Sequence, residues 1–331
     1  MDETKGGIWH IGVDEAGYGP NLGPLVQVGV AIRVASEPPL PIPKELISWW
    51  DVLGNAVTKD KRKANKKILV DDSKEVFSAA RPLEGLERLE NALFMVGITP
   101  MGQNLWRSLA PFWIEPANEA LEPWHDPLLP FPFQKKSTDR VDQLSVWERE
   151  LAENGLGPIH VRVRMVFPRA FNKTVEDSQS KATVLTDGVG RFLQWGLDLA
   201  APGEGVFAVV DKLGGRDRYG AWLGSVLGGW VAPGEESLAK SDYRVIQTEK
   251  ELRVCFESKA DQNHLPVAIA SMIAKYLRER SMYAFNAWWQ TKVVGLVGTA
   301  GYPQDAKRFL KEVDFARQNL GIPMEVLWRQ R

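Results

Sequence analysis

Four acidic residues lie where predicted strands or helices begin or end. Asp14 and Glu15 close the first apolar segment, Asp211 closes a later apolar run, and Asp261 precedes a helix-like segment rich in small residues. Strand ends in open α/β sheets face the crevice where ligands bind, and carboxylates gathered there repel one another unless a cation lies between them. Mg²⁺ or Mn²⁺ with oxygen ligands supplies that charge, and two such ions can hydrolyse a phosphodiester.

The same four acids also have an ordinary structural explanation. A lone aspartate at a strand end is more often a turn residue or a helix cap, and an Asp-Glu pair before a glycine turn is commonly structural. Spacing along the chain does not show that the four side chains converge. Taken by themselves, the residues leave a metal site and a structural role both open.

Composition narrows the class of protein. The chain has 331 residues, of which 44% are apolar, and its 41 basic residues nearly balance 42 acidic ones, as in a globular domain. There is no apolar run long enough for a membrane helix, no signal peptide is recognised, and the glycine-rich turn after Glu15 lacks the spacing of a nucleotide P-loop. With a single cysteine, Cys255, and four histidines, neither a disulfide nor a zinc framework is expected. We therefore expect a cytoplasmic protein without membrane partners, in which any affinity for nucleic acid comes from a local basic surface.

Hydrophobic periodicity predicts the elements that must position the acids. An alternating pattern that ends in Val166 predicts a half-buried strand with Arg164 on its polar face. The order of the elements predicts an α/β fold with a mixed sheet flanked by helices. The predicted strands are 8–13, 25–34, 159–166, 205–211 and one or two within 243–256, and the predicted helices are 74–96, 142–153, 185–197, 265–282 and 304–318.

One segment interrupts this pattern. Residues 100–133 contain seven prolines, which disfavour a long helix. We expect a single domain over residues 1–331 with an insertion or subdomain at 98–157. Aromatic residues in this segment form either a platform for stacking bases or, more commonly, the core of the insertion or a partner surface. They are Trp106, Phe112, Trp113, Trp124, Phe131 and Phe133.

Two basic segments are candidates for contacts with phosphate. Residues 59–67 can follow a nucleic-acid backbone or form a solvated loop. Arg216 lies in a glycine turn shortly after Asp211, where backbone N–H groups and a guanidinium can bind phosphate, although the turn can equally be an ordinary loop.

The segments that carry the four acids resemble the type 2 ribonuclease H family, the ribonucleases HII and HIII. Residues 14–20 (DEAGYGP) are similar to the opening DEAGRGP motif, and residues 72–74 (DSK) to the family's DSK motif. Residues 209–211 resemble the strand with the third acid, residues 259–276 the stretch with the fourth, and Gly301-Tyr302 the C-terminal GY element. These motifs occur in the family's order over nearly the whole chain.

The resemblance implies a ribonuclease H-like fold and assigns roles to residues. Asp14, Glu15, Asp211 and Asp261 would be the catalytic set that binds two Mg²⁺ or Mn²⁺ ions. The resemblance also implies substrate contacts: the turn would sense the ribose 2′-hydroxyl, Lys74 would contact phosphate near the scissile bond, and Tyr302 would pack near the sugar. With Arg216, whose assignment comes from its own glycine turn, the predicted substrate-binding residues are Gly17, Tyr18, Gly19, Lys74, Arg216 and Tyr302.

Three departures indicate a divergent branch of that family. Tyr18 stands where ribonuclease HII has arginine and ribonuclease HIII usually has lysine, the interval from Asp211 to Asp261 is long, and the insertion has no recognised counterpart. We expect a metal-dependent endonuclease that acts on RNA–DNA hybrids or on ribonucleotides embedded in duplex DNA. The alternatives are a structure-specific DNA nuclease or 3′–5′ exonuclease with the same site, and a nucleic-acid-binding protein without catalysis. The sequence does not reveal which proteins, if any, are its partners.

Overall fold

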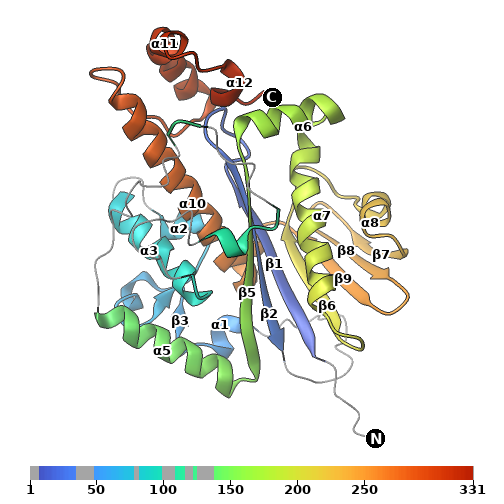
Figure 1. Ribbon diagram of the computed structural model, residues 1–331. Helices are drawn as coiled ribbons and strands as arrows, with labels where there is room; N and C mark the ends of the chain where they lie inside the picture. Colours follow the sequence, from blue (N-terminus) through green and yellow to red (C-terminus); the bar gives the residue numbers. More distant parts are fainter. Residues whose placement is uncertain are drawn as a thin grey trace, which may run out of the picture.

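A seven-stranded sheet forms the centre of the protein (Figure 1), with strand order β5-β2-β1-β6-β9-β8-β7. The computed structural model describes residues 7–34, 48–77, 82–98, 109–115, 122–124 and 138–330. Strands β1, β6 and β9 run parallel and the other neighbours pair antiparallel, which confirms the predicted mixed sheet. The strands are β1 (Ile8–Ala16), β2 (Leu25–Val34), β5 (Leu156–Val166), β6 (Gly205–Asp211), β7 (Trp230–Glu236), β8 (Lys240–Ile246) and β9 (Glu251–Glu257), and a separate pair is β3 (Val57–Thr58) with β4 (Ile68–Leu69).

Helices cover both faces of the sheet (Figure 1) because alternate residues of β2 are apolar on both sides. Val28 and Val30 pack toward α10, whereas Leu25 and Ala31 belong to the cluster under α7. The first face carries α1 (Trp49–Val52), α2 (Ser73–Val76), α3 (Pro82–Met95), α5 (Thr138–Glu153) and α10 (Leu265–Gln290), and the second carries α6 (Pro168–Ser178), α7 (Lys181–Leu199) and α8 (Gly220–Leu227). The remaining helices are α9 (Ala260–Asn263), α11 (Pro303–Asn319), α12 (Met324–Leu327) and the 3₁₀ turns Lys61–Lys63 and Ala110–Phe112.

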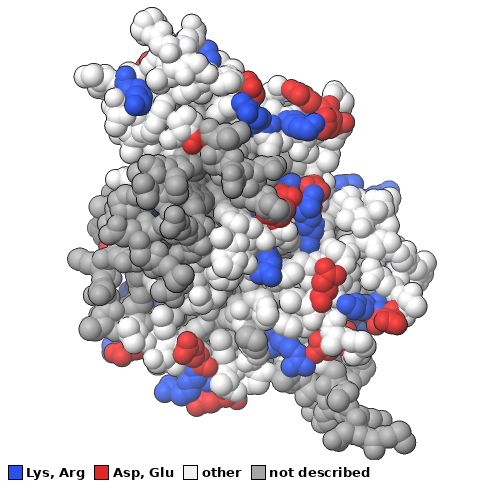
Figure 2. Space-filling view, viewed as in Figure 1, with Lys and Arg blue, Asp and Glu red and all other residues white. Residues whose placement is uncertain are grey.

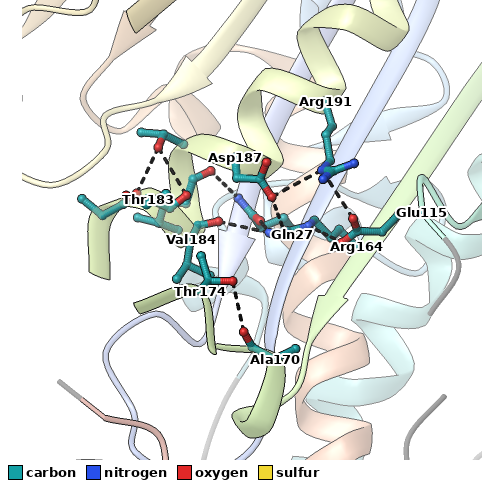
Figure 3. Close-up of polar contacts among 12 residues, drawn as sticks. Gln27, Glu115, Arg164, Ala170, Thr174, Thr183, Val184, Asp187 and Arg191 are labelled. Carbon is teal, nitrogen blue, oxygen red and sulfur yellow. Dashed lines mark hydrogen bonds and ion pairs between the residues drawn. The ribbon is translucent and has the colours of Figure 1, made fainter. Parts of the chain in front are cut away.

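The predicted half-buried character of β5 is wrong at Arg164, because α7 covers the polar side of that strand. Arg164 is 5% exposed, and its guanidinium donates to Glu115 at 2.6 Å, to Asp187 at 2.7 Å and to Gln27 Oε1 at 3.1 Å (Figure 3). These acceptors come from other parts of the chain, so the alternation of β5 alone does not reveal them. Burial of the charge is tolerated because it is paired and hydrogen-bonded.

Parts of the predicted insertion pack onto the main structure. Trp113 forms a bridge with Val163 at the free edge of β5, and Trp147 lies in the α10-side core. Trp124 is 2% exposed and contacts the rings of Trp288 and Trp289, so it is a core residue that packs against α10 and not within the insertion alone. Phe112 and Trp113 are partly buried against the α10-side core, while Trp106, Phe131 and Phe133 lie outside the described residues.

The sequence patterns locate most elements but not all their limits. The predicted helix 74–96 is in fact the two helices α2 and α3, since Pro82 begins the second one. Helix α10 continues past Met282 to Gln290, and α6, α8 and β7 were not predicted. Strand β7 lies at the sheet edge and carries exposed residues, which weakens its apolar signal. Within the described residues, no helix has the length and apolar character needed to span a membrane.

Candidate active site

Parallel pairing of β1 and β6 brings two of the acids to the same edge of the sheet. Gly12 pairs with Val209 and Val13 with Val210, so Asp14 and Asp211 are the next residues of each strand. Asp14 is 7% exposed, and Asp211 is half-buried.

Close packing of α10 on β1 brings the fourth acid to this edge. A Cβ at Gly12 would lie 2.3 Å from backbone atoms of Pro266 and Val267, so only glycine allows this approach. The short helix α9 precedes α10, and its Ala260 N–H donates to Asp211 Oδ1 at 3.1 Å. Asp261, the next residue, is 7% exposed.

Burial raises the pKa of all four carboxyls, and the charge of neighbouring acids raises it further at Asp14, Glu15 and Asp261. Burial, followed by the charge of Glu15, raises the pKa of Asp14 well above its usual value, although a hydrogen bond with Ser271 opposes the rise. Burial, and then Asp211, raise the pKa of Glu15 to about 7. The pKa of Asp261 also rises to about 7 through burial and neighbouring acids, and burial raises the pKa of Asp211 despite backbone N–H donors. The structure therefore gathers the four predicted acids into one electrostatic cluster.

A fifth carboxylate, Asp72, belongs to the same cluster and was missed by the sequence analysis. Asp72 is 6% exposed, accepts a hydrogen bond from the Lys74 N–H at 2.9 Å, and its side chain hydrogen-bonds with Asp261. Gln262 Nε2 lies 3.4 Å from the other oxygen of Asp72. The available signal was the DSK motif itself, in which an aspartate before a short helix is a helix cap.

Lys74 is the predicted cation that the structure places against these acids. Its side chain is exposed, and burial lowers its pKa less than the charges of Asp72, Asp261 and Asp14 raise it. In return Lys74 lowers the pKa of Glu15 and Asp211. Lys74 therefore offers a positive charge at the exposed side of the cluster.

Two buried arginines hold the glycine turn from inside the protein. Gly17 has φ +90°, and Arg329 Nη2 donates to Gly17 O at 2.6 Å and also to Pro20 O. Arg278 Nη2 donates to Leu22 O at 3.3 Å. Neither arginine is marked by a local pattern in the sequence, because each contact joins residues more than 250 positions apart. The side of the turn at Gly19 is open, since a Cβ there would meet nothing within 4 Å.

The other predicted substrate residues lie at different distances from the cluster. Tyr302 is 55% exposed and follows Gly301, whose carbonyl accepts the Asn21 N–H at 2.8 Å, so it lies beside the glycine turn. Arg216 is exposed, lies 5.4 Å from the ring centre of Tyr219, and donates to Arg218 O at 2.9 Å. The structure therefore groups Tyr302 with the turn and Arg216 with the loop after β6.

The basic segment 59–67 reaches the edge of the cluster. Lys59 Nζ donates to the carbonyl of Gln262, the residue after Asp261, and lies 4.0 Å from the ring centre of Trp50. Arg62 pairs with Asp60 at 2.9 Å, which offsets part of the local positive charge.

The carboxylates are electrostatic neighbours rather than a formed coordination shell. Among the described residues, no three acidic, histidine or cysteine side chains are arranged so that they could themselves hold a metal ion. The donor set consists of oxygen atoms, which suits Mg²⁺ or Mn²⁺, and the raised pKa values reflect a repulsion that a divalent cation would offset.

Comparison with known proteins gives one family match. A model of the ribonuclease HII family matches residues 231–317, which include Asp261, α10 and Tyr302. No curated protein matches. Similar solved structures include the ribonuclease HII of the PCNA:RNase HII complex from Archaeoglobus fulgidus (18% identity, 97% of this chain and 94% of that chain, TM-score 0.41). Another is the ribonuclease H2 from Pyrococcus horikoshii OT3 (15% identity, 96% of this chain and 92% of that chain, TM-score 0.44). A third is Bst-RNase HIII in complex with Mn²⁺ (15% identity, 98% of this chain and 67% of that chain, TM-score 0.40).

The family match covers the segment with the fourth acid, and the motifs that resemble the family continue in order toward the N-terminus. The mixed sheet brings those motifs to one edge. Over residues 231–317 the chain is therefore similar to the ribonuclease HII family, whose members are ribonuclease H-like hydrolases.

Proposed function

We propose that this protein is a metal-dependent endonuclease that hydrolyses the RNA strand of RNA–DNA hybrids, or ribonucleotides embedded in duplex DNA. The observation that carries the proposal is the cluster of Asp14, Glu15, Asp211 and Asp261 directly beside an open glycine turn. Carboxylates without a counter-cation are costly to bury, so a purely structural role gives no reason to gather four of them.

The four carboxylates would hold the ions, because they supply only oxygen ligands and repel one another in their absence. Two bound divalent ions would activate a water molecule and stabilise the leaving oxygen of the phosphodiester. The resemblance to type 2 ribonucleases H implies products with a 3′-hydroxyl and a 5′-phosphate.

The remaining residues would orient the substrate. Lys74 would neutralise a phosphate oxygen at the exposed side of the cluster, where it already faces Asp14 and Asp261. The turn at Gly17, Tyr18 and Gly19 would approach the ribose closely at Gly19, where a Cβ would meet nothing within 4 Å. Ser271 would keep Asp14 oriented through its hydrogen bond with that carboxylate.

A panel of labelled duplexes tests the proposal: an RNA–DNA hybrid, a DNA duplex with one ribonucleotide, and plain DNA, each with Mg²⁺ or Mn²⁺. We expect cleavage of the first two and none of the third. The replacement at Tyr18 motivates a DNA nuclease with the same site as the alternative, and equal cleavage of plain DNA would favour it. If no duplex is cut and Mn²⁺ binding does not depend on Asp14, the protein is a nucleic-acid-binding relative without catalysis.

A further inference from the structure

We propose that Lys181, held over the ring of Tyr18, is the cation that binds substrate phosphate at the glycine turn. This inference rests on the proposed function and adds a substrate-binding residue to it. Tyr18 brings no positive charge to the turn. Lys181, from a distant part of the chain, would supply that charge.

The two side chains form one unit. Lys181 Nζ lies 4.4 Å from the ring centre of Tyr18 and 5.9 Å from that of Phe171. An ammonium ion over an aromatic face is attracted by the ring, so the flexible lysine chain is held at the turn. Tyr18 and Phe171 both pack against the α7-side core, which fixes the rings.

The position of the ammonium group suits an anionic ligand. Lys181 is the first residue of α7, whose first turn contains no acidic residue. The N-terminal end of a helix carries partial positive charge, which adds to that of the ammonium group. Burial, and then the charge of Glu15, raise the pKa of the Tyr18 phenol, so Tyr18 neighbours the acidic cluster as well as Lys181.

Lys74 and Lys181 approach the end of β1 from opposite faces of the sheet. Lys74 lies in α2, which packs into the α10-side core through Val76, whereas α7 covers the other face. A nucleic-acid strand that crosses the glycine turn would thus meet Lys74 on the side of the acids and Lys181 on the side of Tyr18.

The face shown in Figure 2 does not by itself present a phosphate-binding surface. On the face shown in Figure 2, the described acidic and basic side chains are mixed in small groups and no extended basic surface is formed. The net charge of the chain is −1. Individually placed cations can then supply phosphate contacts, and Lys181 is one that is held beside the turn by the ring of Tyr18.

The test measures binding of the full-length protein to a DNA duplex with one ribonucleotide, in EDTA to prevent cleavage, over a series of salt concentrations. We expect Lys181→Gln to weaken binding on the order of tenfold and to reduce the slope of log K against log[salt] by roughly 0.7–0.9, the contribution of one phosphate contact. Lys181→Arg should retain binding. The matched control is Lys173→Gln on α6, which removes an exposed lysine paired with Asp177 and should leave both quantities unchanged.

A double-mutant comparison tests whether the two side chains act together. Tyr18→Leu should weaken binding about as much as Lys181→Gln, and combining the two should add little. Tyr18→Arg places a cation directly in the turn, so Lys181→Gln in that background should cost much less than in the wild type. Additive losses in the double variant would contradict the pairing.

The outcomes separate this inference from the proposed function. If the wild type cuts the ribonucleotide duplex and Lys181→Gln has the same affinity and salt slope, the inference is overturned while the proposed function stands. If the wild type cuts no ribonucleotide substrate, the proposed function fails. The same salt series on plain duplex DNA then decides whether Lys181 binds phosphate. Circular dichroism of each variant shows that a loss of binding is not a loss of folding.

Discussion

Replacing Asp14 by asparagine should stabilise the metal-free protein at high pH. The pKa of Glu15 and that of Asp261 are each raised to about 7, so near pH 5–7 the folded state holds protons that the unfolded state has released. The free energy of unfolding therefore falls as pH rises through this interval, the reverse of the usual behaviour of a salt-bridged carboxylate. Above pH 7 Glu15 and Asp261 lose their protons, so the repulsion within the cluster increases.

The size of the effect follows from the same shifts. Each pKa unit corresponds to about 1.4 kcal/mol, so a rise of two to three units limits the loss in the free energy of unfolding to about 3–4 kcal/mol per carboxylate. The contributions of coupled carboxylates do not add fully. Asp14→Asn removes one of the repelling charges at nearly constant volume. We expect it to raise the stability of the metal-free protein at pH 8 by about 1–3 kcal/mol and to change it little at pH 5.

Thermal unfolding at pH 5 and pH 8, with EDTA or with Mn²⁺, measures both sides of this prediction. With Mn²⁺ at pH 8 the wild type should be more stable than Asp14→Asn, because the wild type gains stability by binding ions and the variant gains much less. Asp177→Asn on α6, an exposed aspartate, is the matched control. The reasoning is refuted if Asp14→Asn lowers the metal-free melting temperature at pH 8, or if Mn²⁺ stabilises both proteins equally.

Three further substitutions test the scaffold around the site. Arg329→Met removes hydrogen bonds to two carbonyls of the glycine turn and should cost about 2–4 kcal/mol in urea unfolding; any surviving enzyme should discriminate less between RNA and DNA. Gly12→Ala places a Cβ 2.3 Å from the backbone at the start of α10 and should cost more than about 2 kcal/mol, whereas Gly205→Ala, with its nearest neighbour atom at 3.6 Å, should cost under about 1 kcal/mol. Asp72→Asn removes a charge that raises the pKa of Asp261, so Mn²⁺ titrations should show binding that persists to lower pH than in the wild type; an unchanged pH dependence would place Asp72 outside the site.

Local patterns were sufficient to predict the parts of the site that depend on neighbouring residues. Apolar runs that end in Asp14 and Asp211 are strands because their periodicity and β-branched residues are local properties. The small residues after Asp261 predicted a helix packed closely on the sheet, and α10 begins at Leu265. Convergence of the acids could not be deduced from spacing, since it depends on the parallel pairing of β1 with β6.

Features that depend on distant contacts escaped prediction. The role of Arg329 arises because the end of the chain returns to the glycine turn, and Leu22 forms a bridge with Trp328 there. Arg164 is buried only because Glu115 and Asp187 approach it from other elements. A charged side chain carries no local sign of such partners, so sequence alone assigns it to the surface.

Cleavage of a DNA duplex that contains one ribonucleotide, with Mn²⁺ and with analysis of the product ends, tests the central claim most directly. The wild type should cut at the ribonucleotide and leave a 3′-hydroxyl and a 5′-phosphate, while Asp14→Asn should remain folded and lose the activity. A wild-type protein that leaves this duplex intact, or an Asp14→Asn variant that cuts it as fast as the wild type, would contradict the assignment of the carboxylate cluster as the catalytic site.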